Sequence, residues 1–113
     1  MSIHYHGKTF RSVSNTANGE VSTETLFHYQ QQADIVTATY SGGGILLGNL
    51  IAKVASDGTL DMRYQHLNQD YELMTGRCTS VPEMLDNGKL RLHERWQWTS
   101  GDGSSGESVV EEV

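Results

Sequence analysis

Five side chains with the chemistry of a small-molecule binding site recur at alternate positions in the second half of the chain. Glu94, Trp96 and Trp98 alternate along one segment, and Tyr64 and His66 alternate along an earlier one. Alternate residues of a β-strand point to the same face, so each set would share one face of a strand. Flat aromatic walls with a few fixed polar groups are typical of pockets for small molecules. We therefore take these five residues as the candidate ligand-binding site, for an apolar or aromatic compound.

Two alternatives concern the same residues. Glu94 and His66 could act as acid and base, which would make the protein an enzyme. The tryptophans could also be plain core, with Glu94 pointing out through a bulge. An inward carboxylate must pair, bind water or stay protonated, and the side chains that could pair with Glu94 are Tyr64, His66 and Arg77. A simple final hairpin would place Glu94 opposite Glu111 or Glu112, and the sequence leaves open that register and the direction of Arg77.

Other chemistry finds little support in the residue pattern. His4 and His6 have the spacing of metal ligands, but a zinc site needs a third protein ligand, so we expect no metal and no cofactor. Cys78 is the only cysteine, which excludes an internal disulfide and favours a buried, inert thiol. The glycines of residues 41–44, SGGG, match no phosphate-binding motif and predict a hairpin turn.

The elements that must position these residues are short β-strands. Runs of β-prone residues alternate with turn signals such as Asn18-Gly19, Asp57-Gly58 and Asn87-Gly88. The expected strands are 3–13, 21–31, 35–40, 45–55, 60–67, 71–81, 90–99 and 107–113. Eight strands joined by short turns favour a single all-β domain over residues 1–113, an antiparallel up-and-down barrel closed without free edges. A two-sheet sandwich is the alternative, although it would need a long connection.

Alternation also predicts which side chains face the interior of the barrel. The expected inward sets are Leu60, Met62, Tyr64 and His66 on one strand and Leu90, Leu92, Glu94, Trp96 and Trp98 on another. The intervening residues, among them Arg63, Arg91, His93, Arg95 and Gln97, should form charged pairs in water.

Segment 45–55 carries apolar residues on both faces and is therefore expected to be covered on both sides. A second copy of the chain could supply the outer cover. Ile45, Leu47 and Ile51 are the residues expected in such a homodimer interface, and an interaction protein without a ligand is a third hypothesis for the function.

Charge and composition restrict the partners. The 113 residues carry a formal net charge of −6, which disfavours binding to nucleic acid or to anionic membranes. The first ten residues are polar and basic, so we expect neither a secretory signal nor a membrane span, and a cytoplasmic protein.

A resemblance to a known family rests on four stretches: GKTFRSVSN, RYQHLN, ELMTGRC and RLHERWQWTSGDGSSGESVVEE. Between Gly7 and Glu112 the chain resembles small bacterial proteins that are often labelled N-acetylglutamate synthase. The resemblance implies a calycin-like barrel, the group that includes lipocalins, fatty-acid-binding proteins and avidin. It implies no catalytic residues. Because the two tryptophans lie on one strand, whereas those of avidin are spread over several, it does not imply biotin binding.

Overall fold

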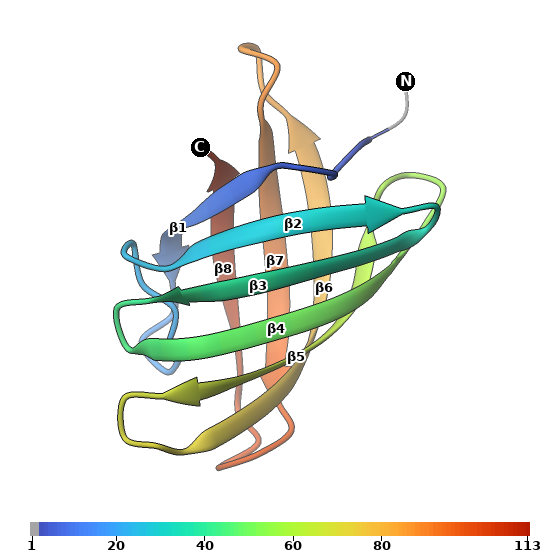
Figure 1. Ribbon diagram of the computed structural model, residues 1–113. Coiled ribbons are helices and arrows are strands. Elements are labelled where there is room, and N and C mark those ends of the chain that lie inside the picture. Colours follow the sequence, from blue (N-terminus) through green and yellow to red (C-terminus); the bar gives the residue numbers. More distant parts are fainter. Residues whose placement is uncertain (1–2) are drawn as a thin grey trace.

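Eight antiparallel strands close into one barrel in the computed structural model, which describes residues 3–113 (Figure 1). The strands are β1 (Thr9–Asn15), β2 (Leu26–Gln32), β3 (Ile35–Gly42), β4 (Ile45–Val54), β5 (Leu60–Asn68), β6 (Leu73–Met84), β7 (Leu90–Trp98) and β8 (Ser105–Glu112). Each strand pairs with its neighbours in the chain, and β8 pairs with β1 to complete the ring. The predicted up-and-down barrel is confirmed, and the sandwich alternative is wrong because all eight strands belong to the one ring.

Two of the predicted strand starts are wrong, and both errors concern segments that cross an end of the barrel. Residues 3–8 lie outside β1, and residues 16–25 form a loop before β2. Thr25 explains the second error. Its backbone N–H donates to the carbonyl of Ser22 (3.0 Å), and its Oγ1 accepts from the N–H of Ser22 (3.1 Å). These local bonds replace sheet pairing. We call residues 16–25 the mouth loop.

Side chains alternate between the interior and solvent along β5 and β7, as predicted. Within the two inward sets, Tyr64 and Glu94 are partly buried and the other seven residues are buried. On the outer face Arg91 pairs with Glu111 (3.1 Å) and His93 with Glu83 (2.8 Å). Such exposed pairs contribute at most about 1 kcal/mol each, so the outer charges add little to the stability of the barrel.

The N-terminal segment fills one end of the barrel. Tyr5 has no exposed surface, and its ring centroid lies 5.9 Å from that of Tyr29. Its backbone N–H donates to Oε1 of Gln31 (2.9 Å), which ties the segment to β2. The same half of the interior is filled by fully buried apolar side chains: Phe10, Val36, Leu60, Leu90, Leu92 and Val110. This end is therefore closed, and the opposite end is the mouth.

The segment SGGG forms the predicted hairpin turn between β3 and β4. Gly42 and Gly43 have φ angles of 116° and 61°, which side chains rarely tolerate. A Cβ atom on Gly42 would lie 2.1 Å from the backbone oxygen of Glu24. The turn therefore requires glycine for space as well as for conformation.

Strand β4 carries apolar residues on both faces, but an irregularity changes which residues face outward. The pairing with β5 shifts by one residue between Ile45 and Leu47, and such a bulge inverts the alternation. Ile45 consequently points inward and is 2% exposed, whereas Leu47 and Ile51 are 63% and 57% exposed. The prediction that Ile45 shares an outer face with Leu47 and Ile51 is wrong for this reason.

Glycines inside the strands make room for the aromatic rings of the interior. Gly76 lies directly opposite Tyr64, and a Cβ atom there would meet the Tyr64 hydroxyl oxygen at 2.2 Å. Gly48 stands opposite Tyr40 in the same way. Gly106, opposite Trp96, completes the pattern. A glycine inside a strand often marks such a close approach.

The pairing of Gly76 with Tyr64 predicts the effect of one methyl group. Gly76→Ala should push the Tyr64 ring out of its place and lower the free energy of unfolding by about 1–3 kcal/mol, the usual cost of overpacking. Urea unfolding followed by tryptophan fluorescence measures this change. Gly44→Ala is the control, because the nearest atoms to its Cβ position lie 3.8 Å away. Equal stabilities of the two variants would contradict the packing described.

Candidate functional site

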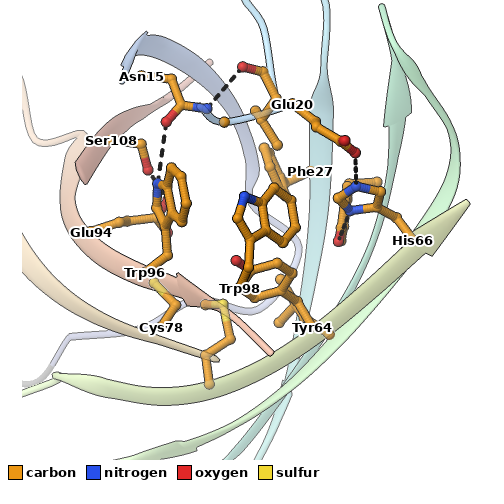
Figure 2. A pocket seen from close by; sticks show the side chains of 15 residues that line it. Asn15, Glu20, Phe27, Tyr64, His66, Cys78, Glu94, Trp96, Trp98 and Ser108 are labelled. Carbon is orange, nitrogen blue, oxygen red and sulfur yellow. Dashed lines mark hydrogen bonds and ion pairs between the residues drawn. The ribbon is translucent and has the colours of Figure 1, made fainter. Parts of the chain in front are cut away.

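The mouth end of the barrel contains a cavity of about 50 Å³ that is lined by all five residues of the candidate site. Tyr64 and His66 come from β5, and Glu94, Trp96 and Trp98 come from β7. Figure 2 shows Glu94 beside Trp96 on one side and His66 beyond Trp98 on the other. The structure thus brings the five residues together, although their binding of a ligand stays a prediction.

Aromatic rings form the walls of this cavity. Trp96 and Trp98 lie with their ring centroids 5.4 Å apart. Tyr64 and His66 both approach Trp98 edge to face, at 5.9 Å and 5.7 Å. Phe27 also lines the cavity. Edge-to-face and offset arrangements at such distances are the favourable ones for aromatic pairs.

Both tryptophans are hydrogen-bonded to the chain at the start of the mouth loop. The Nε1–H of Trp96 donates to Oδ1 of Asn15 (3.2 Å), and that of Trp98 donates to the carbonyl of Asn18 (3.1 Å). Asn15 in turn donates from Nδ2 to the carbonyl of Val21 (3.0 Å) (Figure 2). Buried indole N–H groups usually find such partners. Here the partners connect the cavity walls to the loop above them.

His66 is held between two polar side chains. Its Nε2 lies 2.8 Å from the Glu20 carboxylate, and its Nδ1 lies 2.9 Å from the Tyr40 hydroxyl. Asn68 donates to both carboxylate oxygens of Glu20 (3.3 Å and 3.2 Å). If Nε2 carries the proton, Nδ1 can accept from Tyr40. Glu20 therefore fastens the mouth loop to β5.

Glu94 meets hydroxyl groups rather than the expected partners. Ser108 on β8 and Ser80 on β6 stand directly opposite it in the sheet. The Ser108 hydroxyl donates to the carboxylate at 3.0 Å. Ser80 also favours the ionised carboxylate, although its Oγ lies outside the geometry of a formed hydrogen bond. Burial is the largest effect and raises the pKa of Glu94 to about 7.

Several predictions about the partners of Glu94 are wrong. Glu111 and Glu112 do not oppose it, because β8 begins at Ser105 and its register places Ser108 there. Arg77 points outward and donates to Oε1 of Gln97 at 2.6 Å and 3.2 Å. The two ring nitrogens of His66 are hydrogen-bonded to Glu20 and Tyr40 and not to Glu94. The described residues show no hydrogen bond from Tyr64 to Glu94.

The thiol and the phenols that line the cavity keep their protons near pH 7. Burial, with a smaller contribution from the charge of Glu94, raises the pKa of the Cys78 thiol well above its usual range. This agrees with the prediction of an inert thiol. Burial likewise raises the pKa values of Tyr40 and Tyr64, so both keep their protons.

Sequence reasoning missed part of the site. Phe27 and Tyr40 follow the alternation of their strands and could have been found by it. Ser80 and Ser108 required the register across the sheet. Nothing in the sequence indicates that Glu20 belongs to the site, because its contact with β5 depends on the path of the mouth loop.

The described part of the chain contains neither a cluster of metal-ligating side chains nor a membrane-spanning helix. Residues 3–113 contain no group of three or more His, Cys, Asp and Glu side chains that could hold a metal ion. Over the same residues there is no helix with the length and apolar character needed to cross a membrane.

Comparison with known proteins gives one match. Residues 3–113 match the model of the family described as Avidin-like protein. No curated protein and no solved structure matches the chain.

The raised pKa of Glu94 predicts how stability depends on pH. The ordinary value is 4.5, and the folded value is about 7. A carboxyl whose pKa is raised by folding stabilises the protein at low pH, and this contribution is lost as pH rises. The free energy of unfolding should therefore fall by roughly 2–3 kcal/mol between about pH 4.5 and 7. Urea unfolding at pH 5 and pH 8 measures this for the native chain and for Glu94→Gln, in which the loss should vanish.

Glu107→Gln provides the control for this experiment, because the Glu107 side chain is 73% exposed on the outer face. It should show the same pH dependence as the native chain. If Glu94→Gln does so as well, the pKa of Glu94 is not raised by folding.

Proposed function

Because the chain belongs to the avidin-like protein family and forms a closed calycin-type barrel, we propose that it is a small-molecule binding protein. Its ligand is a compound with a flat apolar or aromatic body, held in the cavity at the mouth of the barrel. The residues proposed to contact it are Tyr64, His66, Glu94, Trp96 and Trp98.

The observation that supports this proposal best is the composition of the cavity wall. Two tryptophans, two tyrosines and a phenylalanine line one cavity together with a few polar groups of fixed orientation. Rings of this kind offer a flat ligand large contact areas, while the polar groups select its orientation.

The size of the cavity indicates that binding requires movement. A volume of about 50 Å³ holds a few water molecules, whereas pockets for drug-sized ligands measure roughly 300–1,000 Å³. The mouth loop is the segment that can make room, because its residues Gly19, Glu20 and Val21 line the cavity and are bonded to the walls through the Glu20 side chain and the Val21 carbonyl. We expect the ligand to displace part of this loop.

The enzyme alternative receives less support from the geometry. Both nitrogens of His66 are engaged, by Glu20 and by Tyr40, so the ring is not free to exchange a proton with Glu94. The acid–base pair expected from sequence is therefore not formed in this structure.

Flat aromatic compounds provide a direct test of binding. Benzamide, benzamidine, benzoate and indole should be titrated up to millimolar concentration, and at least one should change the tryptophan fluorescence and raise the melting temperature. Tyr64→Leu, which removes a wall of the cavity, should weaken that binding about tenfold, in line with the energy of an aromatic contact.

The matched control is Tyr71→Leu, since Tyr71 is 77% exposed. It should bind as the native chain does. The proposal fails if none of the four compounds gives either signal. It also fails if Tyr64→Leu, checked for folding by circular dichroism, binds as tightly as the native chain.

A homodimer is the second candidate, favoured by exposed apolar residues on the outer face. Leu47 and Ile51 project from β4, and Leu73 on β6 is 77% exposed. Leu67 lies between them, because it pairs with Leu47 on one side and with Leu73 on the other. Leu47, Leu67 and Leu73 form an apolar row across β4, β5 and β6, and Ile51 lies on the same outer face beyond Asn49. Exposed apolar side chains of this kind are what copies of a chain bury. Ile45 takes no part, since it points inward.

Mass measurement by size-exclusion chromatography with light scattering tests this interface. The native chain should elute as a dimer at micromolar concentration, and the double variant Leu47→Ser with Ile51→Ser should elute as a monomer. Thr37→Ser with Thr39→Ser, two outward residues of β3, should leave the dimer intact. A monomeric native chain would exclude the interface.

A further inference from the structure

We propose that the inner part of the cavity is a subsite for a positively charged nitrogen group of the ligand, with Glu94 as its counter-ion. Amidinium, guanidinium and protonated amine groups have the required chemistry. This inference rests on the proposed binding function and adds the chemical class of the ligand.

The first reason is that Glu94 has no basic partner. The eight Lys and Arg side chains lie on the outer face or at the rim, and none in the described chain pairs with Glu94. Lys8, at the closed end, is paired with Glu112 at 3.4 Å. Buried charges in proteins are normally paired. A cationic ligand would supply the positively charged partner that the described chain does not provide for Glu94.

The second reason is the pair of hydroxyl groups beside the carboxylate. Ser80, Glu94 and Ser108 stand in one row across β6, β7 and β8. Ser80 is fully buried, and its Oγ is the one buried side-chain polar atom among residues 3–113 without a hydrogen-bond partner. A hydroxyl can accept as well as donate. Glu94 and Ser108 line the cavity and offer oxygen acceptors to a group that carries several N–H donors, while Ser80 stands beside Glu94 in the sheet.

The third reason is the surroundings of this row. Trp96 follows Glu94 on the same face of β7, and its ring lines the cavity. Aromatic faces attract cations, most strongly when water is excluded. The other carboxylate of the cavity, Glu20, is bonded to His66 and Asn68. An anionic ligand would meet both carboxylates and is disfavoured.

Binding of such a group should depend on pH, because the carboxylate must be ionised. The titratable side chains facing Glu94 are Tyr5, Glu20, Tyr29, Tyr40, Tyr64, His66 and Cys78, with Glu112 and Lys8 paired at the closed end. The phenols and the thiol have raised pKa values and stay neutral. Glu20 and His66 are bonded to each other. Glu94 itself, with a pKa of about 7, therefore sets the profile, and affinity for a cation should rise up to about pH 8.

Three compounds with the same flat body and different charge provide the experiment. Benzamidine is a cation, benzamide is neutral and benzoate is an anion. At pH 8, calorimetry should show benzamidine binding at least about tenfold more tightly than benzamide, the size expected for a charge-assisted hydrogen bond, and benzoate binding most weakly. From pH 8 to pH 5 the affinity for benzamidine should fall about tenfold or more, while that for benzamide stays constant.

Glu94→Gln should abolish the preference for benzamidine and its pH dependence while benzamide still binds. Glu111→Gln, which changes a glutamate of the outer face, should preserve both. Ser80→Ala should reduce the preference and leave benzamide unaffected. Binding of the three compounds without regard to charge would overturn the cation subsite and leave the binding function standing, whereas no binding by any of them, nor by indole, would overturn the binding function itself.

Discussion

The pairing of β1 with β8 is the contact on which the other features of this protein depend. It converts a meander of eight strands into a ring, so that no strand edge is left for association with other chains. It also determines what lies inside. With β8 held between β1 and β7, Ser108 stands beside Glu94, and Asn15 at the end of β1 reaches the Trp96 indole. A different register would send these side chains to the outer face.

The interior is divided into two halves of different character. Toward the closed end, apolar side chains and Tyr5 fill the space as a conventional core. Toward the mouth, aromatic rings are accommodated by glycines opposite them and are accompanied by polar groups. The two carboxylates of this half differ in the number of hydrogen bonds that they accept. Glu20 accepts three, from His66 and Asn68, while Glu94 accepts one, from Ser108. An apolar residue at position 94 would avoid the free-energy cost of burying a carboxyl group there.

Much of this architecture follows from local patterns in the sequence. Alternation and turn signals predict the eight strands, the inward faces of β5 and β7, and the meeting of Tyr64 and His66 with the tryptophans. What escapes prediction depends on contacts between distant segments. The residue pattern predicts the wrong face for Ile45, because it does not show the bulge that shifts the pairing between Ile45 and Leu47. The partners of Glu94 depend on where β8 begins, and Glu20 depends on the path of a loop. The resemblance to a family supplied the barrel type but none of these contacts.

Because the N-terminal segment fills one end of the barrel, the two ends differ, and the cavity lies at the other end. In the proposed binding function a ligand would enter past the mouth loop, and the part that enters first would come to rest nearest Glu94. Its trailing part would remain at the loop, next to solvent. The proposed site would recognise the head of a compound whatever is attached to its tail, so a free molecule and the same head group on a longer carrier would bind in the same way.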